Sequence, residues 1–171
     1  MDEGSSTFML VSLVILVFLS AFFSASETAY SSLNQIRLKS RADSGDAQAR
    51  KVLALAKRYD SLLSTILVGN NIVNIMLSSV ATLFFITILK EDRSVAATVS
   101  TAVTTVIVLV FGEISPKSLA KESPEAFAQF SAPLIRMFMW ILTPVNFLFS
   151  LWKRLLSKIF KFKDDKGVTP D

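Results

Sequence analysis

Two carboxylates and three short polar motifs interrupt the long apolar runs of this sequence, and all of them present oxygen atoms. The carboxylates are Glu27 and Glu113. An ionisable group at membrane depth is costly, so by default it is a candidate for function. The chain contains no His and no Cys, which removes the commonest general base, the thiolate nucleophile and the usual transition-metal ligands. Any bound metal must therefore be held by oxygen, which favours hard cations such as Mg²⁺ or Ca²⁺.

The first polar motif runs from Phe23 to Tyr30 and ends the first apolar run. Ser24, Glu27 and Thr28 recur with Ser31 at helical spacing and share one face. Hydroxyl and carboxylate oxygens on one stripe suit a hard cation. Small residues also allow close helix packing. For Glu27 itself, we favour an ion pair with a basic residue of the segment that follows.

The second motif lies in the longest uncharged run. Asn70, Asn74 and Ser78 recur every four residues and form a polar stripe on an otherwise apolar helix. Their amide and hydroxyl oxygens could ligate a cation, or they could form hydrogen bonds between helices worth about 0.6–2 kcal/mol each. For each residue alone the two roles are balanced, but for the cluster we favour a binding site.

The third motif, Gly112-Glu-Ile-Ser-Pro-Lys117, is the most informative. Pro116 has no N–H, so it kinks the helix and frees the carbonyl four residues earlier, that of Gly112. The motif therefore places a free carbonyl beside the Glu113 carboxylate, and such backbone at membrane depth is tolerated where it lines a cavity. A pair between Glu113 and Lys117 at i, i+4 would weaken a cation site.

Three uncharged runs must position these motifs: 8–23, 61–89 and 94–112. With its flanks, each reaches the length of about 20 residues that a spanning helix needs. The first run has no basic region before it, so we interpret it as a span and not as a cleaved signal peptide. We predict an all-α integral membrane fold with three transmembrane helices, at about 8–33, 61–89 and 94–118.

Charge predicts the orientation. Segment 37–58 carries seven Lys and Arg residues against two Asp residues, so the positive-inside rule makes it cytoplasmic, with the N-terminus outside and the C-terminus in the cytoplasm. We expect a cytoplasmic helical hairpin at 35–58, turning at Ser44-Gly45-Asp46, with Asp46 or Ser44 capping its second helix.

Within residues 124–160, the stretch 126–151 is apolar enough for a fourth span, but three features argue against it. Arg136 would lie near the bilayer centre, Pro133 and Pro144 would divide the stretch, and a fourth crossing would place the basic residues after Trp152 outside. We predict a juxtamembrane amphipathic helical belt at the inner interface, with Trp140 and Trp152 at headgroup level. Residues 1–160 would form the transmembrane domain, and the polar tail 161–171 would be a linker.

At its three motifs the sequence resembles the membrane domain of the CorC and cyclin-M magnesium transporters. The motifs are Ser24-Ala-Ser-Glu-Thr-Ala29, Gly69-Asn70-Asn71 and Gly112-Glu-Ile-Ser-Pro-Lys117, with the basic hairpin between the first two. The resemblance covers nearly the whole chain. It implies a homodimer in the inner or plasma membrane and a Mg²⁺ site that opens to the cytoplasm. It also implies Mg²⁺ export, in possible exchange for Na⁺, and a CBS-domain pair that would follow the linker and bind ATP.

By this resemblance, the metal site is carried to Ser24, Asn70, Gly112 and Glu113, with Ser26, Ser78 and Glu27 as weaker candidates. The expected partners are the lipid bilayer, a second copy of the chain and Mg²⁺, without nucleic acid. One alternative is a membrane anchor or scaffold for a cytoplasmic domain, which would bind no metal and tolerate Asn70→Leu. An intramembrane enzyme using Glu113 or Glu27 is disfavoured, because no His or Cys base and no paired carboxylate accompanies either residue.

Overall fold

The computed structural model describes residues 3–89 and 92–159, and within those residues the regular secondary structure is entirely helical. Three helices are long and apolar enough to cross a membrane, Gly4–Ser31, Tyr59–Leu89 and Arg93–Glu122. They match the predicted spans, so the all-α membrane fold is confirmed. The predicted linker 161–171 lies outside the described residues.

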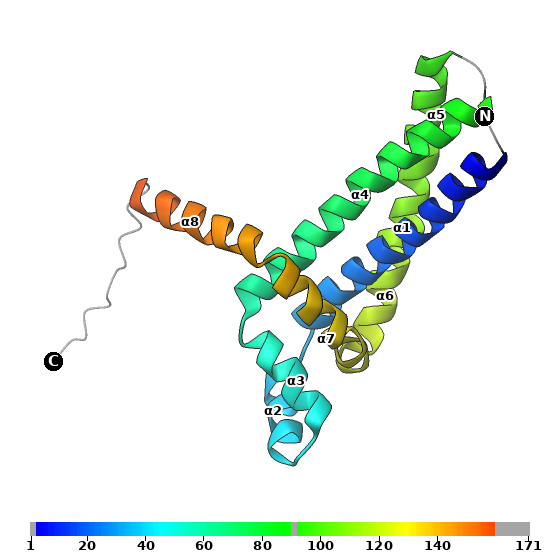
Figure 1. The fold of residues 1–171 in the computed structure, drawn as a ribbon. Coiled ribbons are helices and arrows are strands. Elements are labelled where there is room, and N and C mark those ends of the chain that lie inside the picture. The colour runs from blue at the N-terminus through cyan, green and yellow to red at the C-terminus, as the bar shows by residue number, and fades with distance from the viewer. Residues whose placement is uncertain (1–2, 90–91, 160–171) are drawn as a thin grey trace.

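The three long helices form one bundle (Figure 1). They are α1 (Glu3–Ser31), α4 (Tyr59–Leu89) and a composite helix made of α5 (Arg93–Ile107), the π-helical segment η1 (Val108–Ile114) and α6 (Ser115–Glu122). The N-terminal end of α1, the C-terminal end of α4 and the N-terminal end of α5 lie at the same end of the bundle. As a consequence, α1 runs antiparallel to α4 and parallel to the composite helix.

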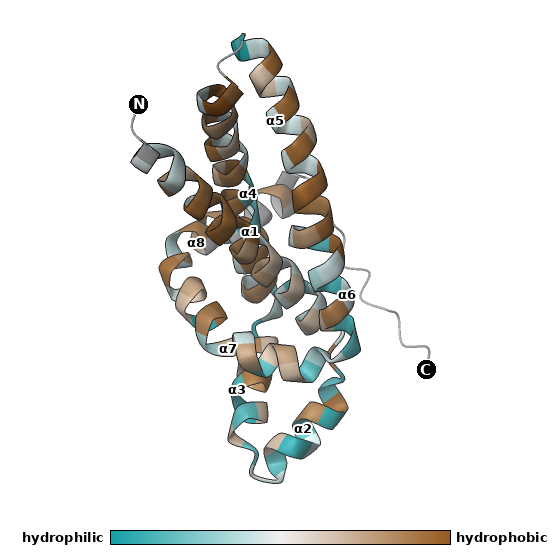
Figure 2. Ribbon diagram, turned by 90° about the vertical axis from the view of Figure 1, so that its right-hand side faces the viewer, coloured by the Kyte–Doolittle hydropathy of each residue, from teal (hydrophilic) through white to brown (hydrophobic). Residues whose placement is uncertain are grey.

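A short helical hairpin lies at the other end of the bundle, where hydrophilic residues gather (Figure 2). It consists of α2 (Gln35–Asp43) and α3 (Ala47–Ala56). Asp46 caps α3, since its carboxylate accepts the N–H groups of Gln48 at 2.9 Å and Ala49 at 3.0 Å. Gly45 turns the chain at φ 101°, in the left-handed region that favours glycine.

Helices α7 (Pro124–Ile141) and α8 (Thr143–Ile159) follow the bundle. Helix α7 crosses the hairpin end of the bundle, where the Tyr30 hydroxyl donates to the Ala128 carbonyl at 3.2 Å. The expectation that Pro133 divides this stretch is wrong, because α7 continues through it. The break falls instead at Leu142, just before Pro144. Helix α8 extends away from the bundle (Figure 1).

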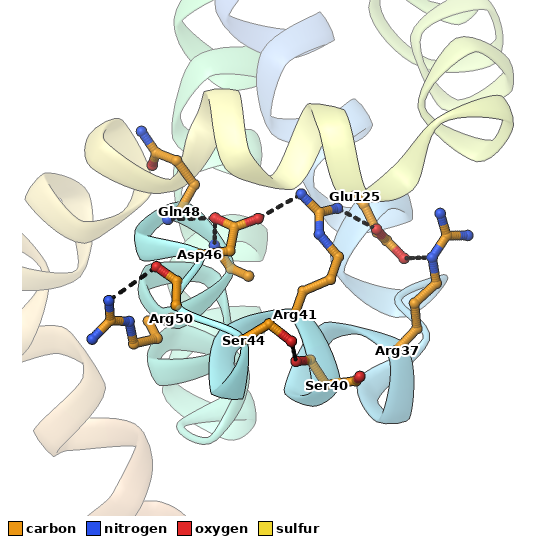
Figure 3. A network of polar contacts seen from close by, with 10 residues as sticks. Arg37, Ser40, Arg41, Ser44, Asp46, Gln48, Arg50 and Glu125 are labelled. Atoms are coloured by element: carbon orange, nitrogen blue, oxygen red, sulfur yellow. Dashed lines mark hydrogen bonds and ion pairs between the residues drawn. The ribbon is translucent and has the colours of Figure 1, made fainter.

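An ion-pair network fastens the hairpin to α7 (Figure 3). The Arg41 guanidinium bridges the Asp46 carboxylate, at 2.6 Å, and the Glu125 carboxylate, at 2.8 Å. Arg37 adds a second pair to Glu125 at 3.4 Å. The N–H of Ala49 and the Arg41 guanidinium hold the pKa of Asp46 below its usual range. The Asp46 carboxylate therefore remains ionised at neutral pH, as its pair with Arg41 requires.

A close contact places α4 against the Phe23 ring. A Cβ atom at Gly69 would lie 2.5 Å from the Cζ of Phe23. The ring has little freedom to move, because Phe23 is 1% exposed and lies between Phe22 and Phe138, with ring centroids 5.6 and 5.0 Å away. Glycine at position 69 therefore sets the distance between α1 and α4.

We expect Gly69→Ala to lower the thermal stability of the protein in detergent. Overpacking costs about 1–3 kcal/mol, which exceeds the gain of about 1 kcal/mol from replacing a helical glycine by alanine. Gly4→Ala is the matched control, because it lies in α1 with nothing within 4 Å of the added Cβ. Melting followed by circular dichroism gives the comparison, and an unchanged midpoint for Gly69→Ala would show that α4 can move away from Phe23 at no cost.

Candidate functional site

A polar cluster connects α1 and α4 in the middle of the apolar bundle. The Ser20 hydroxyl, which is fully buried, donates to the Oδ1 atom of Asn74 at 2.8 Å and lies 3.5 Å from the Oδ1 atom of Asn70. Both amide oxygens therefore converge on one serine. Within a bilayer, such polar side chains must find their partners inside the protein, because lipid offers none.

The π-helical segment η1 approaches the same serine from the third span. A Cβ atom at Gly112 would lie 2.9 Å from the Ser20 Oγ atom. Only a residue without a side chain therefore fits at this position without displacing Ser20. The N–H of Ser115 bonds to the Val110 carbonyl, five residues earlier, and π-helical turns of this kind are frequent at functional sites. A π-helical segment occupies the place before Pro116 where the kink is expected, and both the kink and the freed Gly112 carbonyl stay predictions.

Ser24 lies one turn beyond Ser20 on α1. Its side chain is fully buried, and its hydroxyl has no hydrogen-bond partner among the described residues. A buried hydroxyl without a partner costs free energy and calls for an explanation. An oxygen atom in this position is available to a ligand.

Glu113 follows Gly112 and is half-buried. Within residues 3–89 and 92–159, no hydrogen bond or ion pair involves its carboxylate. The expected competitor, Lys117, instead pairs with Glu27 on α1 at 3.2 Å. The prediction that Glu27 pairs with the hairpin is therefore wrong in its partner, which is on α6. Because α1 and the composite helix run parallel, the pair of Glu27 with Lys117 lies nearer to the hairpin end of the bundle than the contact of Ser20 with Gly112.

Two weaker candidates, Ser26 and Ser78, form no hydrogen bond to Ser20 among the described residues. The Ser26 hydroxyl is buried and donates to the Phe22 carbonyl of its own helix at 2.7 Å. Ser78 is exposed and lines a groove of about 210 Å³ between α4 and α5, together with Asn74 and hydroxyl side chains that include Ser100 and Thr104. The structure therefore brings together Asn70 and Gly112 through Ser20, whereas Ser26 bonds within its own helix and Ser78 shares a groove with Asn74.

The motifs did not single out Ser20, although it is the residue that the other two spans contact. A signal was present, because Ser20 precedes Ser24 by four residues and extends the polar face of α1 by one turn. The described residues contain no group of three or more His, Cys, Asp or Glu side chains that could hold a metal ion. Any cation bound here would be held mainly by neutral hydroxyl and amide oxygens.

We expect Asn74→Leu to destabilise the bundle, because it removes the nearer of the two acceptors of the buried Ser20 hydroxyl. Hydrogen bonds between membrane helices are worth about 0.6–1.7 kcal/mol. Asn71→Leu, on an exposed position of α4, is the matched control and should leave stability unchanged. Reversible unfolding in mixed micelles measures both variants, and equal stabilities would contradict a structural role for the Ser20–Asn74 bond.

The sequence matches the cyclin M transmembrane N-terminal domain over residues 11–171. It is 36% identical to a UPF0053 protein of Haemophilus influenzae, across 96% of this chain and 39% of the relative. It is also 36% identical to the UPF0053 inner membrane protein YfjD of Escherichia coli, across 88% of this chain and 35% of the relative. The polyamine export protein of Escherichia coli is 25% identical, across 93% of this chain and 38% of that protein.

The chain thus spans under two fifths of the length of these relatives. The family match covers nearly all of its residues, and its three membrane-length helices make it a multi-pass membrane protein. This chain belongs to the cyclin M transmembrane N-terminal domain family.

Proposed function

We propose that this chain is the membrane domain of a Mg²⁺ transporter. The observation that carries the proposal is the convergence of all three spans on Ser20, which bonds to Asn74 on α4 and contacts Gly112 in η1. Further oxygen atoms come from residues close to the three contacting ones along each helix. Asn70 precedes Asn74 by four residues, Ser24 follows Ser20 by four, and Glu113 comes directly after Gly112. A purely structural bundle needs no such convergence of polar groups, since apolar packing and small residues suffice to join membrane helices.

The donor set suits a small hard cation. Mg²⁺ releases its water reluctantly and prefers oxygen ligands, so hydroxyl and amide oxygens would replace some of the water while the rest is kept. Glu113 would supply the negative charge, because Glu27 is neutralised by Lys117. The same oxygen atoms could also accept Na⁺, which fits exchange of the two ions.

The proposal also includes the orientation of the chain in the membrane, the direction of Mg²⁺ transport, the oligomeric state and the regulation by ATP. The basic hairpin supports a cytoplasmic position for α2 and α3, with the N-terminus outside. The resemblance of the three motifs to the CorC and cyclin-M transporters supports export of Mg²⁺, a homodimer and regulation by ATP through a following CBS-domain pair. No enzymatic activity is proposed.

Two other functions compete with this one. One relative is named a polyamine export protein, and a polyamine would need several anionic groups along its length to pair with its ammonium groups. Glu113, the residue after Gly112, is the one carboxylate that we assign to the cluster, and a single carboxylate favours a compact cation. A membrane anchor without transport would use the polar groups for packing only, and it would retain its function when Glu113 is neutralised.

Flux through proteoliposomes tests the proposal. We expect the full chain to move Mg²⁺ along its gradient, as followed by an enclosed Mg²⁺-sensitive dye, and Glu113→Gln to abolish this flux. Glu122→Gln, at the end of α6 and away from the cluster, is the control and should preserve it. Absence of Mg²⁺ flux would contradict the proposal, and transport of a polyamine in its place would assign the site to that cargo.

A further inference from the structure

A second site lies outside the membrane bundle, in a groove of about 890 Å³ between α3 and α7. Its lining combines cationic and apolar side chains, and no carboxylate is among them. The groove-lining cations are Arg50, Lys51, Arg58 and Arg136, and the apolar wall includes Pro133 and Trp140. Both Trp140, at 80% exposure, and the four cations are exposed.

The groove cations are not neutralised within the described part of the protein. The Asp46 and Glu125 carboxylates, which join the hairpin to α7, are bound to Arg41 and Arg37. Figure 3 shows Arg50 turned away from these pairs, and its guanidinium donates only to a neutral group, the Gly45 carbonyl, at 3.1 Å. No ion pair among the described residues involves any of the four groove cations. Arg37 and Arg41 of the hairpin are thus paired with carboxylates, whereas the side of the hairpin that faces the groove has an excess of positive charge.

The position of the groove restricts its ligand. Residues of α3 and α7 line the groove. In Figure 2, α7 lies at the boundary between the apolar spans and the hydrophilic α2 and α3. At such a boundary, tryptophan side chains lie among lipid headgroups. Guanidinium groups match the geometry of a phosphate, and basic pockets at the ends of membrane helices bind anionic headgroups.

We propose that this groove binds the headgroup of an anionic phospholipid from the adjoining leaflet. The phosphate would lie among the groove cations, and an acyl chain would follow the exposed Trp140 toward the membrane. A soluble phosphate would satisfy the cations but would leave the apolar wall without a ligand. The site is separate from the Ser20 cluster, so it can be tested independently of cation transport.

The test measures phospholipid retention by the full chain in mixed micelles that hold equal amounts of phosphatidylglycerol and phosphatidylcholine. Native mass spectrometry counts the lipids bound to the wild type and to Lys51→Gln/Arg136→Gln. The control is Lys39→Gln/Lys121→Gln, which removes the same charge from exposed residues outside the groove. Size-exclusion profiles and circular dichroism establish that all three proteins are folded.

We expect the wild type and the control to retain phosphatidylglycerol selectively, and the groove variant to lose this selectivity by roughly tenfold or more, given the attraction of anionic lipid for each basic residue. Equal retention by the groove variant would overturn the proposal. Equal losses in the two variants would also overturn it, because they would indicate a general effect of charge. Displacement of the lipid by glycerol phosphate at the same concentration would assign the groove to a soluble phosphate.

Discussion

Two glycines let α1 approach its neighbours, and the polar cluster depends on that approach. Gly69 leaves room for the Phe23 ring against α4, and Gly112 leaves room for the Ser20 hydroxyl against η1. In water, serine and asparagine side chains at these positions would be solvated, but in a bilayer they need partners inside the protein. Close packing at the glycines brings those partners within hydrogen-bond distance. The hydrogen bonds of the polar cluster therefore require the short distances between helices that the two glycines allow.

The polar groups differ between the hairpin end of the molecule and the middle of the bundle, because each buried polar group needs a partner inside the protein. Toward the hairpin, ionised groups form pairs, with Lys117 and Glu27 joining α6 to α1, and Arg41 joining α2 to α7. Deeper in the bundle, neutral oxygens replace charges around Ser20. Glu113 follows Gly112 and has no ion pair within the described structure, and for this reason the proposed cation site takes its negative charge from Glu113.

Local features of the sequence were sufficient to predict much of the fold. Uncharged runs gave the three spans, and the Ser44-Gly45-Asp46 turn and the cap at Asp46 follow from side chains that act within a few residues. The continuation of α7 through Pro133 was not predictable in this way. It depends on packing against α1, α3 and α4, through buried residues such as Ala132 and Ile135, which the identity of one residue does not reveal.

The arrangement of the candidate site was likewise only partly predictable from the sequence. The three motifs were visible in the sequence, but which faces meet is decided by contacts between helices far apart along the chain. For that reason the partner of Glu27 proved to be Lys117, and Ser20 emerged as the point of contact only in three dimensions. Sequence spacing indicates which residues share a helical face, whereas the glycine contacts determine which faces are close enough to form one site.

Calorimetric titration of the folded full chain with Mg²⁺ measures whether the Ser20 cluster binds a cation. We expect a binding heat for the wild type and for Asn71→Ala, whose side chain is exposed on α4. We expect that heat to be lost in Asn70→Ala and in Glu113→Ala, each verified to be folded. A wild type without binding heat, or folded Asn70→Ala and Glu113→Ala proteins that bind Mg²⁺ as the wild type does, would contradict a cation site at the Ser20 cluster and would favour the membrane anchor.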